Sequence, residues 1–138
     1  MWISDPTWAN HIPLIGNAGL SLETYPYFDK ATASIRFDAM MDTLRKVEKG
    51  DVVLLHGCCH NPTGADLTKE QWQQVVEVAK EREFLPFVDL AYQGFGDGLE
   101  EDAYGVRLLC ENLPEVIIAA SPASANGARE LAAWIEAQ

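Results

Sequence analysis

The chain has 138 residues, of which 48% are hydrophobic and 22% are charged, and its 21 acidic and 10 basic residues give a net charge of −11. This size and composition are typical of one globular domain with a buried core, and they exclude a disordered chain. No apolar run approaches the roughly 18 residues of a membrane span. The acidic balance, without a cluster of Lys and Arg, argues against nucleic acid as a partner.

The first residues, Met1 to Asp5, carry neither a basic patch nor a following apolar stretch, so no secretory signal is expected. The three cysteines, of which Cys58 and Cys59 are adjacent, do not form a disulfide framework. These features predict a cytoplasmic protein that does not bind membranes.

Short apolar runs along the chain predict the strands of a sheet. A short first strand is expected at residues 2–4, and residues 20–25 alternate in polarity like a strand nearer a sheet edge. Residues 52–55, 84–88 and 116–120 are continuously apolar, which is typical of strands buried on both faces.

Amphipathic stretches between these runs predict helices. Asp38 is placed to cap a helix that stops near Gly50, and its inward side chains are Met40, Met41, Leu44 and Val47. Thr68 and Gln71 form a capping-box pattern at the start of the next helix.

A third helix is expected within residues 99–112, burying Val106, Leu109 and Cys110. Strands and helices in alternation predict an α/β fold, a mostly parallel sheet of about five strands with helices on both faces. Residues 122–138 are Ala-rich and are expected to form a terminal helix with a small apolar face.

Polar residues follow three of the predicted strands, in the segments His60–Gly64, Asp89–Tyr92 and at Ser121. Because ligands bind outside the carboxyl ends of the strands of an open parallel sheet, these segments predict a binding site. Two simpler interpretations are open at this point. Asp89 can be a helix-capping or turn carboxylate, and Asn61-Pro62 is a common turn dipeptide.

Three motifs occur in order along the chain: ISDPTWANH from residue 3, HNPTGADLTKEQW from residue 60 and VDLAYQGFGDGLEEDAYGVR from residue 88. Together they closely resemble the class I aminotransferases, in particular the aspartate and aromatic amino acid branch. That family uses pyridoxal 5′-phosphate (PLP) to move an amino group from an amino acid to a 2-oxo acid. The resemblance implies that residues 1–121 are the central part of the family's large domain and that 122–138 are a tail outside it.

The resemblance also implies roles for individual residues. Asp89 resembles the carboxylate that pairs with the pyridinium nitrogen of PLP, which lets the ring accept electrons. Tyr92 and Asn61 resemble the two donors to the phenolate oxygen of the cofactor, and Asn61 is also a contact of the substrate carboxylate. Trp8 resembles the indole that stacks on the cofactor ring beside the substrate.

Four further positions follow from the same resemblance. His11 resembles the imidazole behind the pyridinium-binding aspartate, and Ser121 resembles a hydroxyl that contacts the cofactor phosphate. Pro6 and Pro62 fall where the family has prolines at the site, and cis peptide bonds are expected before them.

The resemblance fails at the Schiff-base lysine. The family has an S-x-S-K-x-x-G pattern after the last matched strand, whereas alignment of Ser121 and Gly127 places Ser124 at the lysine position. No lysine follows Lys80, and serine cannot form a Schiff base. Arg129 is out of register with the family's phosphate-binding arginine, and the arginines that bind substrate carboxylates lie in regions that are not represented here.

We therefore expect a fragment of a PLP-dependent aminotransferase that is inactive alone, has no catalytic residue of its own, and binds PLP weakly and noncovalently at most. The alternative is a non-catalytic structural module that self-associates through the open edge of strand 116–120. Because the family forms homodimers with shared sites, both interpretations are compatible with a homo-oligomer.

The segment His56–His60 contains two histidines and two cysteines, which are the residue types that bind zinc. Neighbouring cysteines on an extended strand point to opposite sides, so these four side chains are not expected to surround one ion. The sequence therefore predicts no metal site, and the cysteines are interpreted as small buried hydrophobes.

Overall fold

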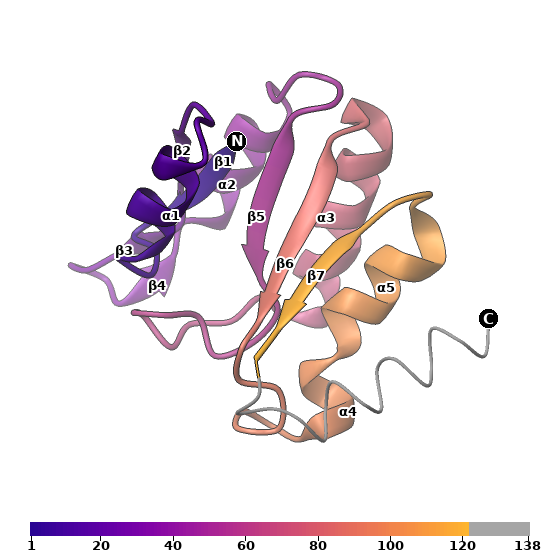
Figure 1. The fold of residues 1–138 in the computed structure, drawn as a ribbon. Helices are drawn as coiled ribbons and strands as arrows, with labels where there is room; N and C mark the ends of the chain where they lie inside the picture. Colours follow the sequence, from indigo (N-terminus) through magenta and orange to yellow (C-terminus); the bar gives the residue numbers. More distant parts are fainter. Residues whose placement is uncertain (122–138) are drawn as a thin grey trace.

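The computed structural model describes residues 1–121, and its centre is a five-stranded sheet in which every pairing is parallel. The strands are β1 (Trp2–Asp5), β2 (Glu23–Pro26), β5 (Val52–His56), β6 (Leu85–Leu90) and β7 (Ile117–Ala120). Their order across the sheet is β2-β1-β5-β6-β7 (Figure 1). The predicted α/β fold with about five mostly parallel strands is confirmed.

The two edges of the sheet are β2, as its alternating polarity predicted, and β7. The prediction that the run at residues 116–120 is buried on both faces was wrong, because three of the four residues of β7 are exposed at this edge. Strand β5 is central and is buried on both faces, because Val53 and Leu55 join one hydrophobic cluster while Leu54 joins another. A separate antiparallel pair, β3 (Phe28–Asp29) and β4 (Ser34–Ile35), was not predicted, since two-residue strands leave no periodic pattern.

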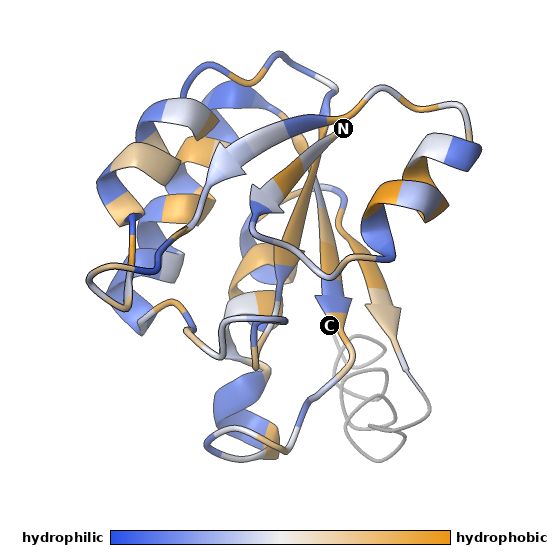
Figure 2. Cartoon of the chain, turned by 90° about the vertical axis from the view of Figure 1, so that its left-hand side faces the viewer, coloured by the Kyte–Doolittle hydropathy of each residue, from blue (hydrophilic) through white to orange (hydrophobic). Residues whose placement is uncertain are grey.

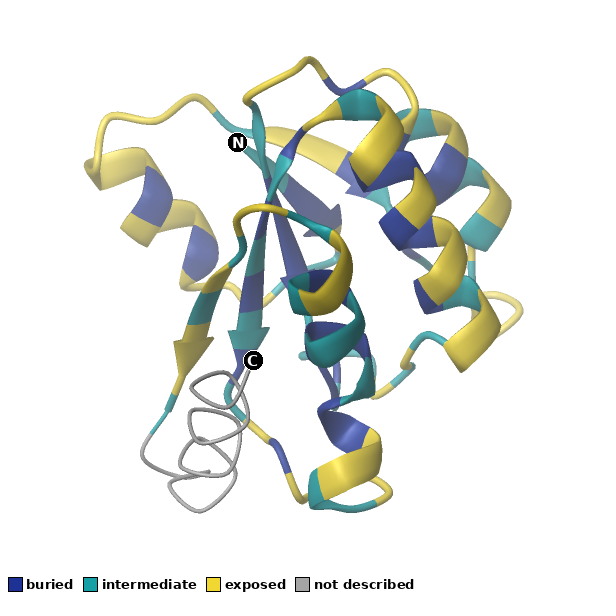
Figure 3. Ribbon diagram, turned by 90° about the vertical axis from the view of Figure 1, so that its right-hand side faces the viewer, coloured by how far each residue is buried: buried dark blue, intermediate teal, exposed yellow. Residues whose placement is uncertain are grey.

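Helices cover both faces of the sheet, as predicted. Helices α2 (Phe37–Leu44), α3 (Lys69–Arg82) and α5 (Tyr104–Asn112) lie on one face, and α1 (His11–Asn17) lies on the other (Figure 3). The larger core lies beneath the three helices, whereas a smaller cluster of Ile3, Ile15 and Leu54 lies beneath α1. Figure 2 shows hydrophobic residues gathered on the strands between these layers.

The predicted capping box of α3 is confirmed. The Gln71 amide donates to Thr68 Oγ1 at 3.2 Å, and the Thr68 amide donates to Gln71 Oε1 at 2.9 Å. The apolar face of this helix is buried against the sheet and α5, with Trp72 only 4% exposed.

Two predicted features of α2 were wrong. The helix begins at Phe37 with Arg36 as its N-cap, so Asp38 lies inside the first turn and caps nothing. An acidic side chain there still interacts favourably with the helix dipole, which is why the sequence signal looked like a cap. The helix ends at Leu44, so Gly50 belongs to the turn before β5. The four predicted inward side chains are buried.

The helix predicted within residues 99–112 is two helices, α4 (Leu99–Asp102) and α5, which meet at Ala103. Val106 and Leu109 are buried, but Cys110 is only partly buried. Helix α1 was missed because it has seven residues, two of which are Pro13 and Gly16, both poor helix formers.

The expected terminal helix and domain boundary concern residues 122–138, which lie outside the described residues, so both stay predictions. Within residues 1–121, no helix has the length and hydropathy needed to cross a membrane.

Candidate active site

The polar segments singled out in the sequence meet at the carboxyl ends of three adjacent strands. Asn61 lies in the loop after β5, Asp89 is the next-to-last residue of β6, Tyr92 follows that strand, and Ser121 follows β7. Trp8 approaches from the loop between β1 and α1. Because the strands are parallel, their carboxyl ends lie side by side, and these residues come together there although they are far apart in sequence.

The five residues line one cavity of about 360 Å³, together with three alanines, Ala91, Ala119 and Ala120. The convergence that the sequence predicted is therefore confirmed, while the role of each residue toward a cofactor stays a prediction. Small side chains along one wall leave space beside the Trp8 indole, which is 38% exposed. A largely apolar cavity with a few polar groups is typical of a small-molecule site.

The carboxylate of Asp89 is held from behind by an imidazole. His11 Nε2 lies 3.2 Å from Asp89 Oδ2, and the His11 side chain is 8% exposed. The Trp8 and His11 rings meet edge to face, with centroids 5.3 Å apart. His11 therefore lies behind Asp89, as predicted, and this contact orients the carboxylate that lines the cavity.

Sequence reasoning missed Thr7, which links two imidazoles. Its Oγ1 lies 2.8 Å from His11 Nδ1 and 3.2 Å from His56 Nε2. When neutral His11 donates from Nε2 to Asp89, its Nδ1 accepts from the Thr7 hydroxyl, and Thr7 can then accept from His56 Nε2. No sequence pattern signals this relay, because Thr7 and His56 are 49 positions apart.

The row of imidazoles continues to His60. The His56 and His60 rings lie 4.1 Å apart, and the Tyr27 ring stacks on His60 at 4.0 Å. His60 Nε2 pairs with Ser4 Oγ at 3.1 Å, and Nδ1 pairs with Thr63 Oγ1 at 2.9 Å. All three histidines of the chain therefore lie in one network behind the cavity.

Burial keeps two of these imidazoles neutral. Desolvation lowers the pKa of His56 from 6.5 to about 4, against the attraction of Asp89. Desolvation and the neighbouring His56 lower the pKa of His60 to about 3. His56 and His60 are thus neutral hydrogen-bonding rings at neutral pH, and they position the loop that carries Asn61.

The loop after β5 is held by its own backbone contacts. Asp66 accepts from the amides of Cys59 at 2.7 Å and His60 at 2.8 Å. The peptide bonds before Pro6 and Pro62 are both cis, as expected. The loop is therefore built around a fixed carboxylate, so the Asn61 side chain has a defined place in the cavity wall.

The predicted donors differ in their present contacts. The Ser121 hydroxyl donates to the Ala91 carbonyl oxygen at 3.1 Å. Tyr92 is 40% exposed, so its phenol is open to solvent on one side. Ser124, the predicted substitute for the lysine, lies outside the described residues.

The cysteine geometry differs from the sequence prediction. Strand β5 ends at His56, and Cys59 has a φ of 48°, so Cys58 and Cys59 do not lie on an extended strand and their sulfurs need not point apart. His56 and His60 are engaged elsewhere, so the four-residue cluster does not form. Cys58 is 5% exposed and packs in the larger core, as its interpretation as a small buried hydrophobe predicted, whereas Cys59 is only partly buried, so the same interpretation was wrong for Cys59.

The fold and site together define a class of protein, and comparison with known proteins names it. The sequence model of the aminotransferase class I and II family matches residues 1–129. The chain belongs to the aminotransferase class I and II family.

Similar proteins include aromatic-amino-acid and aspartate aminotransferases. The chain is 54% identical over 121 residues to the aromatic-amino-acid aminotransferase of Paracoccus denitrificans, covering 88% of the chain and 31% of that protein. It is 47% identical to the aspartate aminotransferase of Escherichia coli, with the same two coverages.

A solved structure agrees with these relatives. The aromatic-amino-acid aminotransferase of Burkholderia pseudomallei, covalently bound to pyridoxal phosphate, superposes with a TM-score of 0.85 at 49% identity. The match covers 87% of this chain and 30% of that one. The chain thus spans about a third of the length of the relatives it matches.

Proposed function

We propose that this chain is the part of an aspartate or aromatic amino acid aminotransferase that holds the pyridine ring of PLP, and that it does not transaminate alone. The observation that carries the proposal is the convergence of Trp8, Asn61, Asp89, Tyr92 and Ser121 on one cavity. The complete protein would transfer an amino group between an L-amino acid and a 2-oxo acid in the cytoplasm.

The residues present fit the ring of PLP, whose chemistry when bound is that of an electron sink. Asp89, oriented by His11, supplies a carboxylate that can hold a proton at the pyridine nitrogen. The Trp8 indole offers a flat apolar surface for stacking. Asn61 and Tyr92 supply donors for the phenolate oxygen, and Asn61 and Trp8 border the space for a substrate.

The cavity offers fewer groups for the phosphate of PLP than for its ring. Ser121 is the one hydroxyl near the end of β7, and no Lys or Arg lines the cavity among the described residues. A dianionic phosphate is normally held by charged donors. We therefore propose weak, noncovalent binding.

The proposed lack of activity follows from the amino-acid sequence. Serine stands at the position of the Schiff-base lysine, and its hydroxyl is a poor substitute for an amine in forming an imine or in moving the substrate proton. Without charged groups to orient both substrate carboxylates, the positioning contribution to catalysis is lost as well.

The proposal is tested by PLP binding and by a half-reaction with the same purified chain. Absorbance-detected equilibrium dialysis should show saturable PLP binding that Asp89→Ala and Tyr92→Phe weaken, while Asp42→Asn, on the exposed surface of α2, leaves it unchanged. Aspartate or tyrosine added to the PLP-loaded chain should yield no stoichiometric 2-oxo acid. Equal binding by all four proteins, or a full half-reaction, would contradict the proposal.

A second candidate function, a self-associating structural module, is favoured by the open strand β7. Three of its four residues are exposed, including Ile117 at 45%, and β7 pairs only with β6 among the described residues. An open strand edge can pair with another chain. A flat PLP titration, together with a mass that rises with concentration in light scattering, would favour this module over the cofactor-binding fragment.

A further inference from the structure

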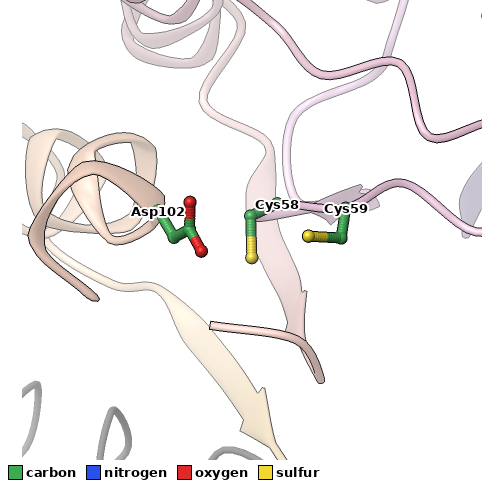
Figure 4. A group of neighbouring side chains, drawn as sticks. All are labelled: Cys58, Cys59 and Asp102. Atoms are coloured by element: carbon green, nitrogen blue, oxygen red, sulfur yellow. The ribbon is translucent and has the colours of Figure 1, made fainter. Parts of the chain in front are cut away.

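A cluster of two thiols and one carboxylate lies beside the cavity but takes no part in the proposed cofactor site. Cys58 and Cys59 follow β5, and Asp102 is the last residue of α4. One ligand atom from each of the three side chains lies within 4.8 Å of the other two. Figure 4 shows the Asp102 carboxylate and the Cys59 sulfur both directed toward Cys58.

The carboxylate of this cluster is held in place by the backbone. Asp102 Oδ2 accepts from the amides of Gly94 at 2.8 Å and Gly96 at 3.0 Å, and Oδ1 accepts from the Asp97 amide at 2.9 Å. Oδ1 accepts only this one of the three hydrogen bonds, so it keeps a lone pair for another partner. Hydrogen bonds of this kind orient metal-binding carboxylates in known sites.

The two thiols are also placed by a fixed backbone. Asp66 accepts from the Cys59 amide, and Cys59 takes a left-handed conformation with a φ of 48°. This turn brings the sulfurs of two consecutive residues to the same side, which an extended strand would not do. The Cys59 thiol has one long contact, 3.9 Å from Sγ to the Tyr92 carbonyl oxygen.

A second cavity reaches two of the three side chains, Cys58 and Asp102, and gives an ion a route to them. It has a volume of about 310 Å³, is lined by Cys58 and Asp102, and carries the further acidic residues Asp66, Asp97 and Glu101. The one basic residue in its lining is Lys69. An excess of carboxylates with a low-dielectric wall on one side favours a cation there.

We propose that Cys58, Cys59 and Asp102 bind one zinc ion, with a water molecule from the acidic cavity as the fourth ligand. Two sulfurs and one carboxylate oxygen are a donor set that zinc accepts, and three protein ligands with one open position are typical of an accessible zinc site. Binding displaces the two thiol protons to solvent and involves no change of oxidation state.

The separation of the ligand atoms is compatible with this geometry after small side-chain rotations. With zinc–sulfur bonds of about 2.3 Å, two tetrahedral sulfur ligands lie about 3.8 Å apart. The three ligand atoms all lie within 4.8 Å of one another, so side chains must close by at most about 1 Å. Cys59 is only partly buried, which leaves its side chain free to make this adjustment.

The proposal is tested with Co²⁺, a spectroscopic probe for zinc sites, on the full chain under a thiol-free reductant. Titration should produce the visible bands of tetrahedral Co²⁺ and a sulfur-to-cobalt charge-transfer band of two-thiolate intensity. Both should saturate at one equivalent and disappear when Zn²⁺ is added. Absence of these bands in the folded chain would overturn the proposal.

Cys59→Ala is the main variant, because Cys59 is less buried than Cys58 and its loss perturbs the core less. We expect its Zn²⁺ affinity to fall at least about tenfold, the scale at which even outer partners affect metal sites. Cys110→Ala is the matched control, because Cys110 lies on α5 and is not part of the cluster. This variant should leave the Zn²⁺ affinity and the band intensity unchanged. Equal Co²⁺ spectra from Cys59→Ala and the parent chain, with circular dichroism showing both folded, would refute the site.

Discussion

His11 and Asp89 are 78 positions apart in the sequence and meet as a largely buried pair, with Nε2 and Oδ2 3.2 Å apart. The pair fixes the direction of the Asp89 carboxylate, because His11 is anchored in α1 and its Nδ1 is hydrogen-bonded to Thr7. The orientation of the proposed pyridine-binding group thus depends on a helix that covers the other face of the sheet.

His11→Phe is expected to weaken PLP binding without abolishing it. Phenylalanine fills the space of the imidazole but cannot donate to Asp89, and a hydrogen bond to a charged group contributes about 1.5–3 kcal/mol. The dissociation constant should therefore rise by about tenfold or more. Equilibrium dialysis measures it, and an unchanged constant would show that Asp89 is oriented without His11.

Thr7→Val is expected to lower the free energy of unfolding by about 1–3 kcal/mol, because it leaves His56 Nε2 and His11 Nδ1 without their shared partner. Urea unfolding measures the change. Thr32→Val is the matched control, since the Thr32 hydroxyl bonds Ser34 on the exposed surface and should contribute little. Equal loss in both variants would argue against the relay.

Stability is expected to fall as the solution is acidified through the range in which histidine ordinarily titrates. The pKa values of His56 and His60 in the folded chain are about 4 and about 3, against 6.5 for an exposed histidine. Below pH 6.5 these histidines bind protons in the unfolded chain but stay neutral in the folded chain. The free energy of unfolding therefore declines toward pH 4. The loss is on the order of 3 kcal/mol per histidine.

Urea midpoints measured across this range provide the test. His60→Gln should flatten the pH dependence, whatever its effect on absolute stability, because one of the two neutral imidazoles has been removed. A parent chain whose midpoint does not change below pH 6.5 would contradict the assignment of buried neutral rings.

Gly105→Ala is expected to destabilise the fold. A Cβ at this position would lie 2.3 Å from Trp72 Cε2, and Trp72 is itself buried between α3 and α5. Overpacking of this kind costs about 1–3 kcal/mol. Gly16→Ala in α1 is the control, because nothing lies within 4 Å of its Cβ and alanine favours a helix. The thermal unfolding midpoint should fall for Gly105→Ala and rise for Gly16→Ala.

Much of the site could be predicted because its residues follow apolar runs. Asp89 and Ser121 come at the ends of β6 and β7, and the parallel topology brings strand ends to one edge. Thr7, Ser4 and Tyr27 could not be found in this way, since their importance lies in contacts with imidazoles far along the chain.

The amino-acid sequence by itself determined the strands of the sheet, because short continuous apolar runs are typical of strands, and it determined the family, because three motifs keep their order. It did not determine which run lies at an edge, since the run at residues 116–120 forms the exposed edge strand β7. It was wrong where one local signal has two structural explanations, as with Asp38, which is acidic in the first turn without being a cap. Only the tertiary structure decided that Cys58 and Cys59 turn toward Asp102. The backbone at Cys59 is left-handed, with a φ of 48°, and a cysteine in the sequence does not signal this conformation.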